Sequence, residues 1–253
     1  MPRFACGIEY DGHAYSGWQR QPSAVTIQAV VEDALSRVAN GRIEIVGAGR
    51  TDAGVHARAQ VAHFDTDSVR TERQWLLGAN SALPEDVALT WVREVPTSFH
   101  ARRSALWRRY HYRIVIRPVR SPLHRRQALL QRAPLDVSGM LSAGSYLLGE
   151  KDFSAFRAAA CQSATPVRNL MSVGAMQIPQ GLRLEFTANA FLHHMVRNIV
   201  GTLLMVGTGD RPPAWCAEVL ASRDRKRAGV TAQAQGLSLD RVAYPPEYAI
   251  PAD

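Results

Sequence analysis

Residues 47–56 read Gly-Ala-Gly-Arg-Thr-Asp-Ala-Gly-Val-His, and the predicted fold is organised around this stretch. It follows a short apolar run at 43–46 and precedes the sequence Gln-Val-Ala-His-Phe-Asp at 60–65, which is typical of a strand. Three glycines fall within eight residues, and glycine permits positive φ angles and close approach of two backbones. We therefore predict a tight loop between two strands.

One carboxylate, Asp52, lies in the middle of this loop. It follows Arg50 by two residues, and a carboxylate beside an arginine on a tight loop at a strand end is typical of a reactive site. The alternative is a surface turn held by an Arg–Asp ion pair. These ten residues alone leave both interpretations open.

Residue type and spacing argue against the two common glycine-rich nucleotide motifs. A P-loop needs Gly-Lys-Ser/Thr, whereas Gly49 is followed by Arg50 and Thr51. A dinucleotide fingerprint needs Gly-x-Gly-x-x-Gly at the start of a helix, but Gly54 comes five residues after Gly49 and a predicted strand follows. A glycine-loop phosphotransferase is therefore only a third hypothesis for function.

Length and composition predict a globular protein of the cytoplasm. With 253 residues and 46% hydrophobic side chains, the chain can form one large domain or two small ones. No apolar run approaches the roughly 18 residues of a membrane span. The N-terminal Met-Pro-Arg-Phe also lacks the apolar segment of a signal peptide. We expect no membrane contact.

The spacing of cysteines and histidines predicts no metal site. Cys6, Cys161 and Cys216 are far apart and form no Cys-x-x-Cys pair, which argues against a zinc site or a disulfide framework. His193 and His194 form the only histidine cluster, and neighbouring side chains on a helix point about 100° apart, so they could not face one metal. We expect neither a metal nor a cofactor.

The positive charge is concentrated in one segment. The formal net charge is +8, yet residues 95–135 contain ten arginines and no acid, which leaves 20 basic against 22 acidic residues elsewhere. A basic protein that is merely soluble would spread its charge, whereas a segregated patch indicates a polyanion, most often nucleic acid. The loop at 11–22 adds Tyr15 and Trp18 among basic residues, a composition suited to stacking on bases.

Hydrophobic periodicity predicts an α+β fold with two similar halves, 1–104 and 105–253. Each half reads strand–helix–strand–strand–helix–strand, although no residue-level repeat is visible. We expect mainly antiparallel sheets forming a central sheet, helices on one face, and an active-site cleft between the halves. The expected strands are 4–10, 43–48, 60–65, 87–95, 106–116, 168–177, 182–189 and a last one ending at 241; the expected helices are 27–38, 71–82, 136–148, 191–206 and 212–220.

Several contiguous motifs resemble the tRNA pseudouridine synthase A family. The loop at 47–56 with its following strand is the longest match, and the resemblance covers nearly the whole chain. It is strongest at 47–65, 78–110, 149–169 and 189–206, and weakest at 118–135. The shorter motifs are Arg-Arg-Tyr at 108–110, His-His-Met-Val-Arg-Asn at 193–198 and Gln-Gly-Leu-Ser-Leu at 235–239.

The resemblance implies roles for five residues. Asp52 matches the family's catalytic aspartate, with Arg50 and Arg197 positioning it and meeting phosphate. Tyr110 matches the tyrosine at the target uracil, and Leu237 would pack opposite it. From the residues alone, Tyr110 could be an ordinary core aromatic. Arg197, within an apolar helix, could either pair with a carboxylate or extend to the helix surface.

The resemblance also implies the reaction and the partner. The enzyme would isomerise uridine to pseudouridine at positions 38, 39 and 40 of the tRNA anticodon stem-loop, as a homodimer and without a cofactor. Asp52 could attack C1′, attack C6 or deprotonate C2′, and the sequence does not choose among these routes. The second hypothesis is a non-catalytic RNA-binding protein on the same scaffold.

Overall fold

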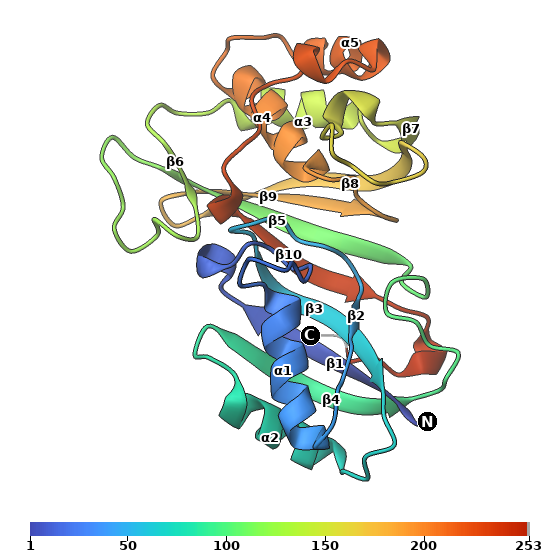
Figure 1. The fold of residues 1–253 in the computed structure, drawn as a ribbon. Coiled ribbons are helices and arrows are strands. Elements are labelled where there is room, and N and C mark those ends of the chain that lie inside the picture. Colours follow the sequence, from blue (N-terminus) through green and yellow to red (C-terminus); the bar gives the residue numbers. More distant parts are fainter. Residues whose placement is uncertain (252–253) are drawn as a thin grey trace. The chain divides into compact units, whose positions relative to one another are not determined.

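The computed structural model describes residues 1–251 and divides the chain into two compact units (Figure 1). The first unit comprises residues 1–107 and the segment from 238 onward, and the second comprises residues 108–237. Each combines helices with mainly antiparallel strands, so the predicted α+β class is confirmed. Within residues 1–251, every helix is too short or too polar to cross a bilayer.

The strands of the first unit run in the order β4-β1-β3-β10, with β2 also paired to β3. Strand β1 is antiparallel to both neighbours, whereas β10 runs parallel to β3 and pairs Ser238 with His56. Because of this pairing, the last strand returns to the first unit, although the sequence patterns placed it in the half at 105–253. The bounds are β1 Arg3–Tyr10, β2 Val46–Gly47, β3 His56–Asp65, β4 Val87–Val95 and β10 Leu237–Ala243.

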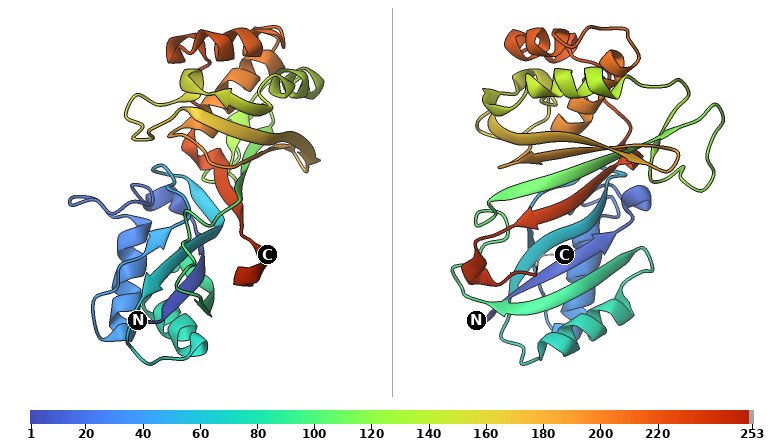
Figure 2. Two further views of the ribbon diagram at one scale, coloured as in Figure 1. Left: turned by 90° about the vertical axis from the view of Figure 1, so that its right-hand side faces the viewer. Right: turned by 180° about the vertical axis from the view of Figure 1, so that it is seen from behind.

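Helices α1 (Ile27–Ala39) and α2 (Glu72–Ala82) cover one face of this sheet (Figure 2). The predicted capping box is confirmed at α2: the Thr71 hydroxyl accepts from the Gln74 backbone N–H, and the Gln74 side chain accepts from the Thr71 N–H. Trp75 on α2 then lies fully buried against Phe4 and Phe64 of the sheet. This aromatic cluster anchors α2 to β1 and β3.

The second unit orders its strands β5-β9-β8-β7, with the short β6 parallel to β5. The predicted hairpin is β8–β9, whose turn places Gln180 at φ 65°. A Cβ added to Gly144 of α3 would lie 2.8 Å from Val173 of β8, so this helix rests directly on the sheet. The bounds are β5 Trp107–Ile116, β6 Leu129–Gln131, β7 Gly149–Asp152, β8 Val167–Ile178, β9 Gly181–Ala188, α3 Val137–Ser145, α4 Met195–Gly207 and α5 Trp215–Ser222.

Alternation along β5 separates two faces of the second sheet. Tyr110, Tyr112 and Ile114 are buried on the face that α3 and α4 cover. Arg109, His111 and Arg113 are only half-buried and share the opposite face, because side chains alternate along a strand. The face that carries the arginines is therefore distinct from the face that carries Tyr110.

Several element boundaries and one helix cap differ from the sequence predictions. The strand expected at 43–48 is reduced to Val46–Gly47, and Ile43 and Ile45 are buried without a strand ladder. The helix expected at 191–206 begins only at Met195, since His194 adopts a left-handed conformation with φ 62°. Thr26 precedes α1 as expected, but its hydroxyl makes no capping bond and is buried without a partner.

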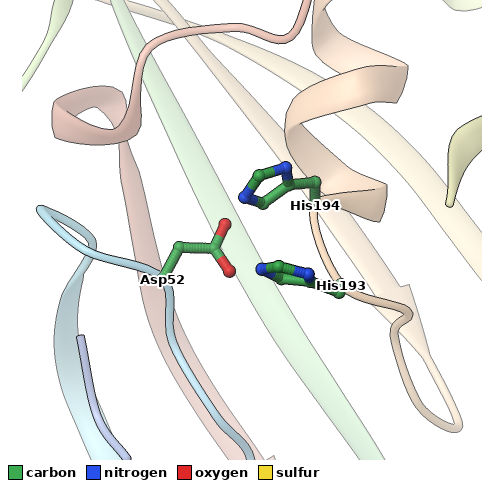
Figure 3. Close-up of side chains that lie close together, drawn as sticks. All are labelled: Asp52, His193 and His194. Carbon is green, nitrogen blue, oxygen red and sulfur yellow. The ribbon is translucent and has the colours of Figure 1, made fainter. Parts of the chain in front are cut away.

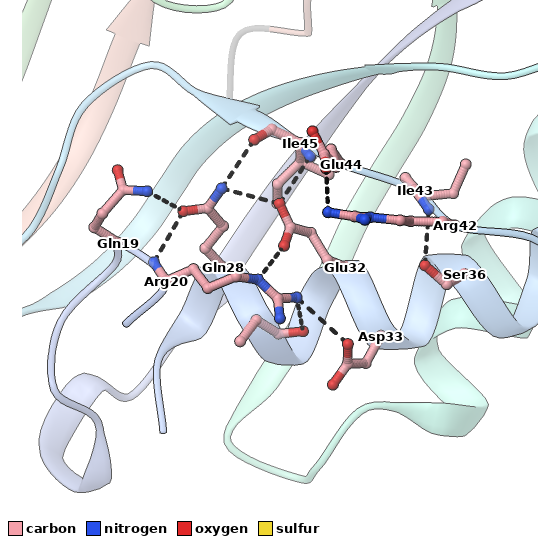
Figure 4. A network of polar contacts seen from close by, with 11 residues as sticks. Gln19, Arg20, Gln28, Glu32, Asp33, Ser36, Arg42, Ile43, Glu44 and Ile45 are labelled. Carbon is pink, nitrogen blue, oxygen red and sulfur yellow. Dashed lines mark hydrogen bonds and ion pairs between the residues drawn. The ribbon is translucent and has the colours of Figure 1, made fainter. Parts of the chain in front are cut away.

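A buried carboxylate ties α1 to its neighbours (Figure 4). Glu32 is only 4% exposed, and its oxygens accept from Arg20 Nε at 2.7 Å, Gln28 Nε2 at 2.9 Å and the Ile45 N–H at 3.0 Å. Gln28 in turn accepts from the Arg20 N–H and donates to the Ile45 carbonyl. One acidic side chain thus joins the loop at 11–22, helix α1 and the segment that leads into residues 47–56, which we call the glycine loop.

Replacing this carboxylate should destabilise the first unit. Glu32→Ala leaves the buried Ile45 N–H without an acceptor and removes the partner of Arg20, which should cost about 1–3 kcal/mol. Asp33→Ala is the matched control, because Asp33 pairs with the same arginine, at 3.4 Å between Asp33 Oδ1 and Arg20 Nη2, but its side chain is 71% exposed. It should change stability by less than about 0.5 kcal/mol. The urea midpoint of each variant measures the difference, and equal midpoints would contradict the assignment.

His63 should give the first unit a specific pH dependence. Burial lowers the pKa of His63 to about 4, and the charges of Arg3 and His100 act in the same direction. In the unfolded chain the pKa is about 6.5. The unfolded state therefore binds the proton first, and stability that is complete above pH 6.5 falls as the pH drops toward 4.

The test replaces the titrating ring with a neutral side chain. His63 Nδ1 accepts from the Ala101 N–H at 3.2 Å, and the Oδ1 of His63→Asn can take over that bond. Between pH 7 and pH 5, the urea midpoint of the wild type should fall more than that of the variant. Parallel falls would show that the proton is taken up elsewhere.

Candidate functional site

The glycine loop lies between β2 and β3 and is held by the loop at 11–22. The Trp18 N–H donates to the Thr51 carbonyl at 3.0 Å, and the Gly54 N–H donates to the Tyr15 carbonyl at 3.2 Å. Gly17 has φ 88°, and a Cβ there would lie 2.7 Å from the Thr51 carbonyl oxygen. Glycine at position 17 therefore lets the two loops touch along their backbones.

The aromatic side chains of the loop at 11–22 belong to this scaffold. Tyr15 and Trp18 are 7% and 2% exposed, and a Cβ on Gly47 would collide with the Trp18 ring. The Tyr15 hydroxyl donates to Asp86 at 2.5 Å. The expectation that these two rings offer a stacking surface for bases is wrong, because both rings are already covered by protein.

Two buried polar side chains hold the glycine loop in place by hydrogen bonds. The Tyr10 hydroxyl lies 2.8 Å from the Thr51 hydroxyl, and Gln60 Nε2 donates to the Gly49 carbonyl at 2.7 Å. Burial raises the pKa of Tyr10, so this phenol stays protonated and available for hydrogen bonding. The backbone is consequently fixed on both sides of Arg50.

Asp52 projects from the restrained loop (Figure 3). Its side chain is half-buried, while Arg50 is exposed, and the Val55 N–H donates to the Asp52 carbonyl to close the turn. A partly accessible carboxylate on a rigid backbone can meet a ligand without reorganisation of the loop. The two interpretations left open above were a reactive site and a surface turn held by an Arg–Asp ion pair, and this arrangement favours the reactive site.

The other predicted residues lie in the second unit. Tyr110 is 7% exposed, and its ring meets Phe191 edge-on at 5.1 Å. Arg197 is half-buried on α4, and its Nε donates to the Ala232 carbonyl at 2.8 Å while its own carbonyl accepts from the Ala232 N–H. Arg197 is therefore held at the start of its helix and does not simply extend along the surface.

Leu237 ends a segment that Tyr112 holds in place. The Tyr112 hydroxyl donates to the Gln233 carbonyl at 2.8 Å, and Gly236 packs on the Tyr112 ring, where a Cβ would come within 2.6 Å. Leu237 is 5% exposed. Of the two tyrosines that share this face of β5, Tyr112 serves the Leu237 segment, whereas Tyr110 packs against the residues that precede α4.

His193 and His194 do not have the geometry assumed from the sequence. Both precede α4, so the angle between helical neighbours does not apply, and their ring centroids lie 4.1 Å apart (Figure 3). Two imidazoles supply only half of the four ligands that zinc usually takes. The pair by itself does not make a metal site, and the absence of a metal stays a prediction.

Tyr10 and Gln60 are the functional candidates that the sequence reasoning missed. Gln60 is fully buried in β3 between the apolar residues Ala59 and Val61, and a polar side chain in such a position is a signal that the sequence contains. Tyr10 gave no such signal, because an aromatic residue at the end of an alternating strand looks like ordinary core.

Comparison with known proteins identifies relatives over the whole chain. A family model described as tRNA pseudouridine synthase matches residues 7–102 and 143–245. The tRNA pseudouridine synthase A of Methylococcus capsulatus is 55% identical over 251 residues, covering 99% of this chain and 93% of that protein. Its counterpart in Aeromonas salmonicida is 51% identical, covering 98% and 93%, and that in Paraburkholderia xenovorans is 47% identical, covering 100% and 93%.

Removing the hydrogen bonds from Tyr10 and Gln60 should make the backbone of the glycine loop more mobile. Tyr10→Phe takes one hydroxyl from Thr51, and Gln60→Leu leaves the Gly49 carbonyl without its donor. Amide hydrogen exchange of residues 49–54 should accelerate severalfold in each variant, because restraints worth about 1 kcal/mol are lost. Tyr244→Phe, which removes the hydroxyl that bonds the Ala101 carbonyl, is the control and should leave that exchange unchanged. Unchanged exchange in all three variants would refute the pinning role.

Proposed function

The chain belongs to the tRNA pseudouridine synthase family, whose members isomerise uridine to pseudouridine in tRNA, and we propose that Asp52 is the carboxylate that drives this isomerisation. The observation that carries the proposal is the anchoring of its loop. The backbone around Asp52 is held by Tyr10, Gln60 and Trp18, while the carboxylate itself stays partly accessible.

The reaction makes modest demands that a carboxylate can meet. The N1–C1′ bond breaks, the uracil turns over, C5 bonds to C1′, the C5 proton leaves and N1 takes up a proton. The base and the sugar stay together and no external oxidant or reductant is needed. An ionised carboxylate can start the rearrangement by attack on C1′, by attack on C6 or by removal of the C2′ proton. We therefore propose a reaction without a cofactor.

Pre-organisation is what the protein contributes to each of these routes. A reacting group that is already held in the reactive geometry avoids the entropy cost of reaching that geometry. Displacing the group by about 1 Å can lower the rate a hundredfold. The hydrogen bonds to Gly49 and Thr51 flank Arg50 and end one residue before Asp52. In this proposal, Arg50 and Arg197 orient the carboxylate and contact phosphate.

Tyr110 and Leu237 complete the proposed site around the base. Tyr110 would stack on the target uracil and assist removal of the C5 proton, and Leu237 would pack on the other side. The edge-on contact with Phe191 fixes the Tyr110 ring, and the Tyr112 hydroxyl bond to Gln233 fixes the segment that ends at Leu237. Both side chains are held before substrate arrives, which supports a binding role.

The proposed substrate is the anticodon stem-loop of tRNA at positions 38, 39 and 40. A base stacked in a helix is out of reach of a half-buried carboxylate, so the target nucleotide must leave its stack. The arginine-rich segment at 95–135 would hold the phosphates while it does so. We further propose that the enzyme works as a homodimer in the cytoplasm, where its substrate is found.

The Asp52 assignment is tested by releasing tritium from C5-labelled uridine in a tRNA transcript. Asp52→Asn keeps the size of the side chain and removes the charge, so turnover should fall by at least about a hundredfold. tRNA binding should stay within severalfold of the wild type. Asp67→Asn, at an exposed position, should behave as the wild type. Tritium release at the normal rate by Asp52→Asn would overturn the Asp52 assignment, whereas no release by the wild type would leave the RNA-binding hypothesis.

A further inference from the structure

Two arginines face each other on the sheet of the second unit, on the side that α3 and α4 leave uncovered. Arg113 of β5 is the direct cross-strand partner of Arg183 of β9, and Arg183 is in turn opposite Met176 of β8. Directly opposed side chains on antiparallel strands have Cβ atoms about 4.5–5.5 Å apart. Like charges at that separation destabilise the strand pair.

The nearest acid does not relieve this repulsion. Glu185 lies two residues from Arg183 and is directly opposite His111, which it contacts at 2.9 Å between Glu185 Oε2 and His111 Nε2. Its other oxygen lies 3.4 Å from Arg109 Nε. Both carboxylate oxygens of Glu185 are therefore directed at His111 and Arg109, away from the Arg113–Arg183 pair.

The guanidinium donors of the pair lack strong acceptors. Arg183 Nη2 contacts Met176 Sδ at 3.3 Å, and a thioether is only a weak acceptor. Arg113 Nε is buried and, within residues 1–251, has no hydrogen-bond partner. A buried donor without an acceptor is costly, and here it stands beside an uncompensated like charge. An anion with several oxygens that meets both half-buried side chains would offset the repulsion between the two charges.

We propose that Arg113 and Arg183 form a clamp for one backbone phosphate of the tRNA. Guanidinium groups bind phosphate through paired N–H donors, and two of them can share one phosphate. The clamp rests on the proposed function and deepens it. Because Arg113 lies on the opposite face of β5 from Tyr110, the clamp is separate from the proposed site for the uracil.

The surroundings of the pair favour RNA as the occupant. Strand β5 continues into the arginine-rich segment, whose Arg117 N–H donates to the Gln131 carbonyl and so starts beside the sheet edge. The clamp is therefore continuous along the chain with the main concentration of positive charge, which contains no acid from 95 to 135. A polyanion can follow such a surface, whereas a single carboxylate from another protein would leave most of it unpaired.

The test measures tRNA affinity as a function of salt for Arg113→Gln, Arg183→Gln and the double variant. Each single variant should weaken binding severalfold and reduce the slope of log K against log salt by about one phosphate equivalent. The double variant should be little worse than either single one, since both arginines hold the same phosphate. KM for tRNA should rise and kcat at saturating tRNA should stay the same. Arg227→Gln, which removes one exposed charge from the same unit, is the control.

The melting temperature of the free protein gives an independent readout. Arg113→Gln removes a repulsive pair, so the variant should melt at the same or a higher temperature than the wild type while it binds tRNA less tightly. A purely structural arginine would do the opposite, and a clear fall in melting temperature would overturn the clamp.

Two further results would overturn the clamp in different ways. If both single variants bind tRNA like Arg227→Gln with an unchanged salt slope, no phosphate is held there. If they weaken self-association in sedimentation without changing the tRNA affinity, the pair belongs to a contact between copies. Neither result touches Asp52, whose role fails only if Asp52→Asn still releases tritium.

Discussion

The anchoring of one loop backbone is the constraint on which the rest of the first unit depends. The glycine loop carries an exposed arginine and a half-buried carboxylate, and such a loop would be mobile if only its ends were tied. Instead, the Thr51 carbonyl accepts from the Trp18 N–H, its hydroxyl meets Tyr10, and the Gly49 carbonyl accepts from Gln60. The Tyr10–Thr51 bond is buried and the Gln60–Gly49 bond is partly buried, which limits the competition from water.

The support for this loop extends well beyond its immediate contacts. Trp18 belongs to the loop at 11–22, whose Arg20 is held by Glu32 of α1. Glu32 also binds the Ile45 N–H, two residues before the glycine loop begins. A single buried acid therefore supports both the loop that holds the Thr51 backbone and the segment that leads into the glycine loop. Its cost of burial is offset by three hydrogen bonds, one of them from a guanidinium.

The protein treats its charges in two different ways. Glu32 and Glu185 are each satisfied by neighbours within their own unit, and Asp65 holds Arg3 by two hydrogen bonds, with the arginine lowering the pKa of that carboxyl. Among residues 1–251, Arg113 and Arg183 have no such acid. Pairs of the first kind stabilise the fold, whereas the second kind is tolerated at a cost, which is the usual state of a residue retained for binding.

The sequence by itself determined the α+β class, the order of the longer strands and helices, the capping box at Thr71, and Asp52 as the residue of interest, because these depend on local periodicity and on contiguous motifs. Tertiary structure alone decided that β10 returns to β3, that Trp18 is scaffold, that Gln60 and Tyr10 pin the loop, and that Arg113 faces Arg183. Each of these joins residues far apart in the chain, and strand pairing and burial across such separations leave no periodic trace in the sequence.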